Sequence, residues 1–228
     1  MRILVLGRGK TGSFVASVAA ERGHSVRVLD EAQNRNAMAL TPPLLVVYDV
    51  VIDFTTPEAA VHNMRACLAT GAKMVVGTTG WYAHLDDMCA LVQRHSAALL
   101  YGTNFSLGVQ ILFRLAETLR EEARGYEISI EETHHITKID APSGTALSLQ
   151  DIFKAVNPET EVEIVSHRVE DVHGEHIITA RSADDVLTVK HESHSRRPFA
   201  EGAVRAAEWV QSRTGCFDFH DVFPQIYA

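Results

Sequence analysis

The chain has 228 residues, of which 46% are apolar and 22% are charged, with a formal net charge of −8 and an isoelectric point near 5.8. This composition is typical of an ordinary globular protein, and the length is sufficient to bury a core. The negative charge argues against electrostatic binding of nucleic acid. Since no apolar run approaches the roughly 20 residues that span a bilayer, we expect no membrane partner.

The N-terminus and the cysteines bear on the compartment. The opening residues, MRILVLGRGKTG, turn at once from a short apolar run to glycine-rich polar sequence and lack the cleavage site of a signal peptide. Cys67, Cys89 and Cys216 are odd in number and widely spaced, which predicts neither a disulfide framework nor a CxxC metal site. We therefore expect a cytoplasmic protein.

Strand-like and helix-like segments alternate through residues 1–105. Short apolar runs that end at glycine-rich or acidic turns are typical of buried parallel strands. The expected strands are 3–6, 25–30, 50–54, 73–80 and 97–106, with helices at 11–23 and 55–71 and one more before the last strand. This alternation predicts an α/β fold, a Rossmann-type doubly wound parallel sheet.

The pattern changes after residue 105. One long helix is expected at 105–124, a strand at 126–135 and a helix at 141–156; three strand-like runs follow at 161–169, 175–182 and 186–193 without helices between them. This order predicts a smaller α+β domain with an open mixed sheet. We expect domains at 1–105 and 106–198, with an amphipathic C-terminal helix inside 199–228 that packs back on the first domain.

The stretch GRGKTG matches the G-x-G-x-x-G pattern and stands between a strand and a helix. Its glycines allow a tight turn, close approach of a pyrophosphate and close helix–strand contact, with the phosphate on the helix N-terminus. Glycine-rich turns also occur for geometry alone, but this context favours dinucleotide binding. The nucleotide-binding loop is expected to comprise Gly7, Arg8, Gly9, Lys10, Thr11 and Gly12.

Asp30 ends the second strand and is placed to accept hydrogen bonds from an adenosine ribose. Glu31 follows it, and two acids should repel a 2′-phosphate, although Arg35 is near enough in sequence to reach one. We therefore predict NADH as the preferred cofactor, with NADPH possible. The alternative is that Asp30 merely ends a strand at a turn.

Two glycine–threonine loops, GTTG and GTNF, each follow a parallel strand. Ligands bind beyond the carboxyl ends of such strands, so both loops should face the cofactor. Glycine–threonine turns are common, and the argument depends on two of them lying along one sheet edge. The residues expected to contact the nucleotide here are Gly77, Thr78, Thr79, Gly102, Thr103, Asn104 and Phe105.

Residues 132–147, ETHHITKIDAPSGTAL, concentrate groups that carry protons or positive charge just before a predicted helix start. Reduction of a C=C or C=N bond needs hydride on one atom and a proton on its neighbour, which a histidine or a lysine can deliver. The backbone N–H groups at 143–145 would favour a carboxylate, and His135 and Lys138 add donors to the same anion. The residues alone thus predict a reductase of a small carboxylated substrate.

Simpler explanations exist for each part of this segment. Adjacent histidines are often exposed loop residues, and SGT after Pro142 has the composition of an ordinary helix N-cap. The histidines could also bind a metal, but no third ligand stands at a useful spacing, so we expect no metal site.

The string ETHHITKIDAPSGTAL resembles the bacterial dihydrodipicolinate reductase family of lysine and diaminopimelate biosynthesis. GRGKTG, VIDFTTPEA, VVGTTGW, GTNFSLGV, GEHIIT and HSRRPFAEGAVRAAEW extend the resemblance over nearly the whole chain in matching order. The family is a Rossmann domain plus a substrate domain, forms homotetramers, and passes hydride to C4 of a cyclic dicarboxylate. The resemblance implies that His134 is the general acid/base, that Lys138 is the second proton donor, and that the carboxylates are bound by His135, Gly144 and Thr145.

Some positions depart from the family or receive no role. The stretch from Glu31 to Asp49 is short, which predicts a trimmed element and puts the adenine pocket in doubt; many members also have Glu at the Asp30 position and a basic residue at the next. Arg196 and Arg197 are assigned no contact, and the GEH segment at 174–176 is interpreted as structural.

Two other functions remain open from sequence. A different nicotinamide dehydrogenase, acting on an amino or imino dicarboxylate, would share the GRGKTG loop but would not need the HHxxK and SGT groups. A dinucleotide sensor without chemistry would predict a degraded proton-donor segment, which this chain does not have.

Overall fold

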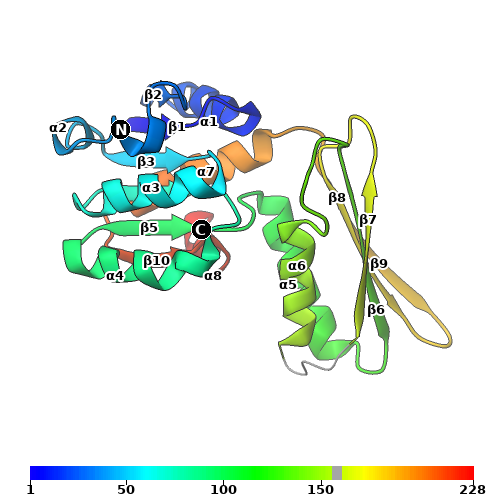
Figure 1. Ribbon diagram of the computed structural model, residues 1–228. Coiled ribbons are helices and arrows are strands. Elements are labelled where there is room, and N and C mark those ends of the chain that lie inside the picture. The colour runs from blue at the N-terminus through cyan, green and yellow to red at the C-terminus, as the bar shows by residue number, and fades with distance from the viewer. Residues whose placement is uncertain (156–160) are drawn as a thin grey trace. The chain divides into compact units, whose positions relative to one another are not determined.

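The computed structural model describes residues 1–155 and 161–228 (Figure 1). The chain forms two compact units. Unit 1 comprises Met1–Ser106 and Arg197–Ala228, and unit 2 comprises Leu107–Arg196. Among the residues described, no helix has the length and apolar character required to cross a membrane.

Unit 1 is built on a six-stranded sheet in the order β10-β5-β4-β3-β1-β2, and all of its pairings are parallel. Its four central strands are mostly buried apolar residues, as expected for a parallel sheet covered on both faces. The predicted doubly wound sheet is confirmed. The strands are β1 (Arg2–Leu6), β2 (Ser25–Leu29), β3 (Val50–Asp53), β4 (Lys73–Val76), β5 (Ala98–Tyr101) and β10 (Gly215–Asp218).

Helices pack on this sheet in pairs: α1 on α7, and α3 on α4. The long C-terminal helix α7 also contacts β3, β4 and β5, so the chain returns to unit 1 after unit 2 is complete. Gly202 permits this approach, because a Cβ there would lie 1.7 Å from the carbonyl oxygen of Phe105. The helices are α1 (Lys10–Glu21), α3 (Pro57–Leu68), α4 (Leu85–His95), α7 (Arg197–Val210) and α8 (Phe219–Ile226), with a short η2 (Tyr82–His84) before α4.

The C-terminal region differs from the single helix expected within 199–228. Helix α7 is followed by strand β10, which pairs in parallel with β5, and then by helix α8. The strand GCFD has only four residues, all half-buried, and therefore shows no apolar run. The cysteine prediction was also wrong, because Cys216 of β10 forms a disulfide with Cys89 of α4. Only Cys67 is free, and it is buried.

The segment between β2 and β3 is short and contains no strand. It contains a three-residue 3-10 turn, η1 (Arg35–Ala37), and a one-turn helix, α2 (Pro42–Leu45). Asn34 fixes it to the unit: its amide donates to Asn63 of α3 at 2.9 Å and accepts from the backbone N–H of Ala39 at 3.3 Å. Because this segment adds no strand, β2 is an edge of the sheet.

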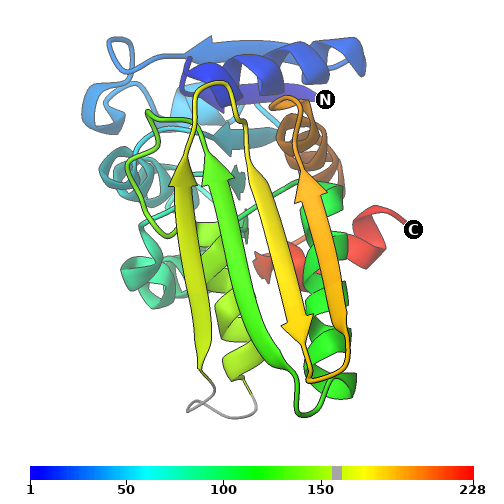
Figure 2. The same cartoon turned by 90° about the vertical axis from the view of Figure 1, so that its right-hand side faces the viewer.

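Unit 2 is a four-stranded mixed sheet in the order β7-β6-β8-β9, with β6 and β7 parallel and the other pairs antiparallel. Its core packs α5 and α6 against one face, and Figure 2 shows the opposite face, which no described helix of this unit covers. The predicted helix at 141–156 begins later, and its last position lies outside the described residues. The elements are α5 (Leu107–Glu122), β6 (Glu127–His134), α6 (Gly144–Lys154), β7 (Val162–Arg168), β8 (Glu175–Arg181) and β9 (Val186–Glu192).

Candidate active site

In unit 1, all the loops predicted to bind nucleotide lie at one edge of the sheet. They follow the carboxyl ends of β1, β2, β4 and β5, which run in the same direction. Backbone hydrogen bonds join neighbouring loops at this edge: the N–H of Gly7 donates to Leu29 at 2.8 Å, and that of Gly77 donates to Asp53 at 2.9 Å. This edge is where open α/β sheets bind their ligands.

The three glycines of the first loop have different roles. A Cβ on Gly7, whose φ is +100°, would lie 2.2 Å from the carbonyl oxygen of Phe54, and one on Gly12 would lie 2.2 Å from the carbonyl oxygen of Gly7. These two positions therefore require glycine for the turn and for helix–strand contact. A Cβ on Gly9 would meet nothing within 4 Å.

Gly9 is also the N-cap of α1 and provides no side-chain hydrogen bond to its first turn. Arg8, Gly9 and Lys10 are exposed, while Thr11 is half-buried and Gly12 is buried. An exposed helix N-terminus with an uncrowded glycine fits the pyrophosphate of a dinucleotide, because the N–H groups and the helix dipole favour an anion.

Asp30 lies half-buried directly after β2. Its carboxylate accepts from the backbone N–H of Gln33 at 3.0 Å, and its own N–H donates to the Gln33 side chain at 3.2 Å. This closed turn holds the acid at the nucleotide edge of the sheet. Glu31 and Arg35 are both exposed on the following segment.

The other two loops divide their side chains between surface and core. Thr78 is buried, its hydroxyl donates to Asp53 at 2.9 Å, and its carbonyl accepts from Trp81 at 2.8 Å. Phe105 is 2% exposed and packs on the ring of Phe219 with centroids 4.5 Å apart. The Thr78 hydroxyl and the Phe105 ring thus make contacts inside unit 1. The other predicted nucleotide-contacting residues of these two loops are Gly77, Thr79, Gly102, Thr103 and Asn104.

Asp53 is a residue to which sequence analysis gave no role. It ends β3 with no exposed surface and accepts from the Thr55 hydroxyl at 2.7 Å, the Thr78 hydroxyl at 2.9 Å and the Asn63 amide at 2.7 Å. Burial raises the pKa of Asp53 above the usual aspartate value, because these neutral donors offset only part of the lost hydration. Asp53 joins the ends of two neighbouring strands and so shapes the nucleotide edge.

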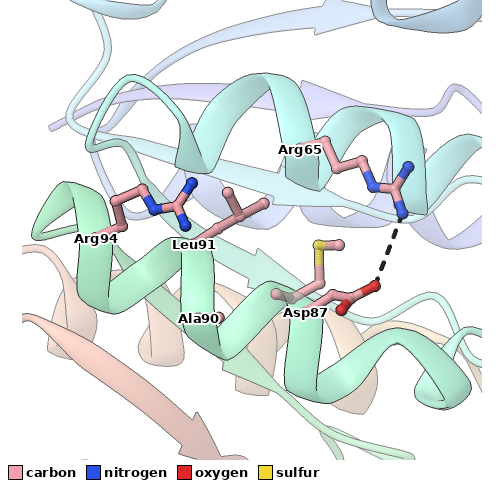
Figure 3. Close-up of a pocket in the computed structure, with 6 residues that line it drawn as sticks. Arg65, Asp87, Ala90, Leu91 and Arg94 are labelled. Atoms are coloured by element: carbon pink, nitrogen blue, oxygen red, sulfur yellow. Dashed lines mark ion pairs between the residues drawn. The ribbon is translucent and has the colours of Figure 1, made fainter.

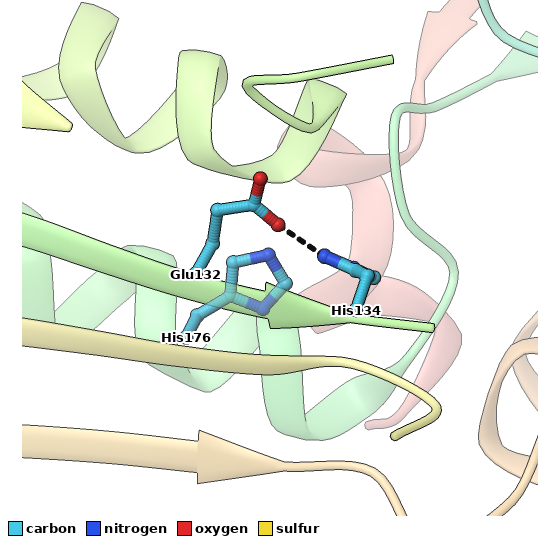
Figure 4. Close-up of side chains that lie close together, drawn as sticks. All are labelled: Glu132, His134 and His176. Carbon is cyan, nitrogen blue, oxygen red and sulfur yellow. Dashed lines mark hydrogen bonds and ion pairs between the residues drawn. The ribbon is translucent and has the colours of Figure 1, made fainter. Parts of the chain in front are cut away.

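In unit 2, three titratable side chains gather at the end of β6 (Figure 4). Nδ1 of His134 forms a very short hydrogen bond with the buried Glu132. The ring of His134 meets the ring of His176 edge-on at 5.1 Å, and His176 lies 3.2 Å from the hydroxyl of Ser143. Burial lowers the pKa of His176 to about 3, with a further contribution from His134, so His176 is neutral near neutral pH.

The pKa of His134 is lowered as well, first by burial and then by the charges of Lys138 and Arg168, although the hydrogen bond and charge of Glu132 oppose the shift. Arg168 donates to the other oxygen of Glu132 at 3.0 Å. Burial disfavours the ionised form of Glu132, yet hydrogen bonds from Ser166, His134 and Arg168 outweigh it, and its pKa lies below the usual glutamate value.

A second group of donors follows His134 in the chain. Arg196 donates to Nε2 of His135 at 3.0 Å, so Nδ1 of His135 carries the proton and donates to the Thr137 hydroxyl at 2.8 Å. Lys138 is held by Asp140 at 2.8 Å. Arg196 is therefore a site candidate that sequence analysis left without a contact; the charged SRR string was its only local signal.

Helix α6 begins at Gly144, with Ser143 as its N-cap: the Ser143 hydroxyl accepts from the N–H of Ala146 at 3.2 Å. Thr145 is buried in the first turn. Ser143 therefore does act as a cap, and in addition its hydroxyl lies beside His176. The N–H of Gly144 already donates to the carboxylate of Asp140, the partner of Lys138, so this helix start can bind a carboxylate.

Glu132, His134 and His176 also place one ligand atom each within 4.8 Å of one another, a grouping of the kind that can hold a metal ion. Sequence analysis named no third ligand: Glu132 stands two residues before His134 and was given no role, while His176 is brought beside them only by the pairing of β8 with β6. Arg168 occupies the second oxygen of Glu132, and this cation disfavours a dication in the same place. The arrangement fits a hydrogen-bonded proton relay better than a metal site.

A surface hollow of about 410 Å³ lies between α3 and α4 (Figure 3). Arg65 and Asp87 face each other across it at 3.9 Å, with side chains 53% and 70% exposed. None of the residues predicted to bind nucleotide or substrate lines it, so we assign it no part in the chemistry. Its lining residues are Arg65, Asp87, Met88, Ala90, Leu91 and Arg94.

A doubly wound parallel sheet with a glycine-rich first loop, followed by a second unit with a cluster of titratable side chains, is the arrangement of a nicotinamide-dependent oxidoreductase. Models of the N-terminal and C-terminal parts of dihydrodipicolinate reductase match residues 1–105 and 108–223. The chain therefore belongs to the dihydrodipicolinate reductase family.

Full-length relatives agree with this assignment. The chain is 34% identical to the 4-hydroxy-tetrahydrodipicolinate reductase of Christiangramia forsetii, with 100% of this chain and 99% of the relative covered. It is 38% identical to that of Natronomonas pharaonis, with 97% and 99% covered. A dipicolinate-bound dihydrodipicolinate reductase from Paenisporosarcina sp. TG-14 has a TM-score of 0.75 at 23% identity, over 97% of this chain and 99% of that one, which shows a shared fold.

The activity is reduction of the 4-hydroxy-tetrahydrodipicolinate intermediate with NAD(P)H, in lysine and diaminopimelate biosynthesis. The predicted family, fold class and activity are confirmed, and the two other functions considered from sequence are set aside. Within unit 1 the structure brings the predicted nucleotide residues to one edge, and within unit 2 it brings His134, His135, Lys138, Gly144 and Thr145 to the end of β6 and the start of α6.

Proposed function

We propose that unit 2 binds the cyclic dicarboxylate and supplies its proton, while unit 1 binds the nicotinamide nucleotide. The observation that supports this most strongly is the composition of the β6–α6 region. It combines a buried Glu132–His134 pair, the ammonium of Lys138 and a capped helix start. His135, Gly144 and Thr145 would bind the two carboxylates. His135 would do so by exchanging one of its present partners, Arg196 or Thr137, for the substrate, and the released Arg196 would add a second cationic donor.

The reaction requires a hydride, a proton and the loss of water from the hydroxylated ring. The nicotinamide supplies the hydride when bound, to C4 of the substrate. His134 acts as general acid/base through Nε2, because its Nδ1 is engaged by Glu132. Lys138, held by Asp140, is the second proton donor. Carboxylates bound beside His134 would raise its pKa and so favour the protonated form at the moment of transfer.

The nucleotide side of the proposal uses the glycine loop at 7–12, Asp30, and the loops at 77–79 and 102–105. We propose NADH as the preferred cofactor. Asp30 would accept from the ribose hydroxyls, and Glu31 beside it would repel a 2′-phosphate. Parallel titrations of the two reduced nucleotides measure this preference directly; NADPH bound or used more than about tenfold better would reject it. Asp30→Ala should weaken NADH binding and reduce the difference in affinity between NADH and NADPH.

We further propose a homotetramer that assembles through unit 2. The uncovered face of its sheet (Figure 2) mixes apolar and charged side chains, including the partly exposed Val165 and Val186 and an ion pair of 2.5 Å between Lys190 and Glu175. Light scattering on the purified protein should give four times the chain mass. Val165→Arg should reduce that mass, and a monomeric wild-type protein at working concentration would refute the proposal.

A cytoplasmic location is also proposed, as for a biosynthetic enzyme that uses soluble nucleotides. The Cys89–Cys216 disulfide is unusual for a reducing compartment, so the test pairs fractionation with thiol trapping in cells. Enzyme found outside the cytoplasmic fraction would refute the location.

The function is tested by following oxidation of the reduced nicotinamide with freshly made synthase product as substrate, with NADH and NADPH in parallel. The planar dicarboxylate dipicolinate, which the Paenisporosarcina relative binds, should compete with this substrate. Competition that disappears in Thr145→Val and His135→Ala would support the carboxylate site in unit 2. Unchanged competition in both variants would contradict it.

A further inference from the structure

Glu132 is the first residue of the ETHHITKIDAPSGTAL string, has no role assigned from sequence, and has an unusual environment for a carboxylate. Its side chain has no exposed surface, and a buried carboxylate is costly unless each oxygen is paired. Both oxygens are paired: one with Nδ1 of His134 and the other with Arg168 at 3.0 Å. The two partners differ in chemistry, because His134 can take part in proton transfer and Arg168, whose guanidinium stays protonated, cannot.

Arg168 is itself fixed in place by backbone carbonyls. Its guanidinium donates to the carbonyl of Asp140 at 2.6 Å and to that of His167 at 2.6 Å. It therefore ties Glu132 to the loop that carries Lys138 and Asp140. A guanidinium with a rigid fork of donors, anchored at three acceptors, keeps the carboxylate ionised and oriented.

The hydrogen bond to Glu132 determines which nitrogen of His134 is available. A neutral histidine has one N–H, and an ionised carboxylate can only accept, so the proton sits on Nδ1. Nε2 is then the nitrogen left to receive or release a proton.

Next to Nε2 lies a residue without a side chain. A Cβ added to Gly174 would lie 3.2 Å from Nε2 and 3.4 Å from Cδ2 of His134, closer than side chains normally pack. Gly174 thus leaves the space beside the reactive nitrogen unfilled. The GEH segment, which the sequence suggested only as structural, places this glycine and the neutral His176 against the same imidazole.

We propose that Glu132 is a positioning residue for the reductase reaction: it fixes His134 in the Nδ1–H tautomer, with Arg168 as its anchor, and Gly174 keeps Nε2 uncovered for proton transfer. This rests on the proposed acid/base role of His134. It assigns new functions to three residues that lie outside the substrate contacts.

The first test compares Glu132→Gln with Glu131→Gln. Glu131 is the adjacent residue on the same strand, but it is exposed and points to the opposite face, where it forms an ion pair with His167 at 4.0 Å. Glu132→Gln should lower kcat by about tenfold to a thousandfold with KM changed little, because orientation and tautomer of the histidine are lost rather than binding. Glu131→Gln should leave both constants unchanged.

The pH profile separates positioning from a merely structural role. The groups that face His134 are Glu132 on its own strand, Arg168 on β7, His176 on β8, and Lys138 in the following loop. Glu132 is the only one of these that favours the charged imidazole, so its neutralisation should move the limb of the kcat/KM profile that reports His134 to lower pH. Glu131→Gln should not move it.

A second variant keeps the test decisive if Glu132→Gln folds poorly. Gly174→Ala retains the Glu132–His134 bond but strains the backbone, because φ at Gly174 is +156°. Its melting temperature should fall, and kcat, measured at a temperature where the variant is folded, should be lowered as well. Nitrogen NMR of the imidazole in the wild-type enzyme should show the Nδ1–H tautomer, and activity should survive a chelator. An Nε2–H tautomer, a Glu132→Gln enzyme with wild-type kcat and pH profile, or chelator inactivation reversed by zinc would each overturn the proposal. If His134→Gln kept full kcat, the acid/base role of His134 would be wrong. If His134→Gln were inactive while Glu132→Gln and Gly174→Ala kept full kcat, only the positioning role of Glu132 and Gly174 would be wrong.

Discussion

Among the described residues, each unit has one fully buried carboxylate in the last part of a strand, and the two carboxylates differ in the direction of their pKa shifts. Asp53 in unit 1 is surrounded by neutral donors from threonine and asparagine, and burial raises its pKa. Glu132 in unit 2 is paired with His134 and Arg168, and these partners lower its pKa in spite of burial. The comparison teaches that burial alone does not define a reactive site. The charge of the partners decides whether a buried acid holds a fold together or tunes a neighbour that can carry a proton.

The largest expected effect comes from replacing His134, the proton carrier that we propose in unit 2. His134→Gln should lower kcat by about two to four orders of magnitude, the usual contribution of general acid catalysis. Nucleotide binding, which we propose for unit 1, should be unaffected. Steady-state kinetics and NADH titration measure the two quantities separately. An unchanged kcat would contradict the acid/base role proposed for His134.

The next effect concerns how the units are stabilised. The disulfide joins α4 to the edge strand β10 across 127 residues of sequence, so its reduction should lower the free energy of unfolding of unit 1 by about 2–5 kcal/mol. Both tryptophans, Trp81 and Trp209, belong to unit 1, and their fluorescence reports on it. Denaturation with and without reductant gives the difference.

A control for that experiment is Cys67, which is buried and free. Cys216→Ala should abolish the response to reductant, while Cys67→Ala should retain it. Equal unfolding curves for the oxidised and reduced wild-type protein would show that the bond adds no stability to unit 1.

A smaller effect distinguishes the two carboxylates by pH. Asp53→Asn should cost about 1–3 kcal/mol, because several buried donors lose an acceptor. Since the folded pKa of Asp53 is raised, its contribution to stability is largest below the usual aspartate pKa and declines as the pH rises through the raised value. The cost of the substitution should therefore shrink from acid toward neutral pH.

Glu132 should show the reverse dependence. Its folded pKa is lowered, so its contribution is present above the usual glutamate pKa and is lost as the pH falls through the folded value. Unfolding of Asp53→Asn and Glu132→Gln at matched acid and neutral pH tests this opposition. Parallel pH trends in the two variants would show that the partners do not determine the difference.

The smallest expected effect is at the carboxylate site. Thr145→Val keeps the shape of a buried residue and removes one hydroxyl, so KM should rise about threefold to tenfold with a smaller change in kcat. A fall in kcat with KM unchanged would mean that the hydroxyl acts in the transition state instead.

The sequence by itself determined the features that are encoded within a short stretch. The G-x-G-x-x-G loop between a strand and a helix identifies the nucleotide edge, because each glycine answers a local steric demand, at Gly7 and Gly12 in particular. The string from His134 to Thr145 likewise holds its donors and its helix start in one continuous segment. Alternation of strands and helices was enough for the doubly wound sheet.

Tertiary structure decided whatever depends on residues far apart in the chain. Glu132 pairs with Arg168, which is 36 residues away in the sequence, and Cys89 forms a disulfide with Cys216, which is 127 residues away. Neither pair has a local sequence pattern that predicts it. Strand β10 has only four residues and shows no apolar run, and it forms by pairing in parallel with β5. Thr78 was predicted to contact the nucleotide, and the sequence could not show that its hydroxyl donates a hydrogen bond to Asp53. Backbone geometry is set by neighbours in sequence, but the protonation of a buried group is set by neighbours in space.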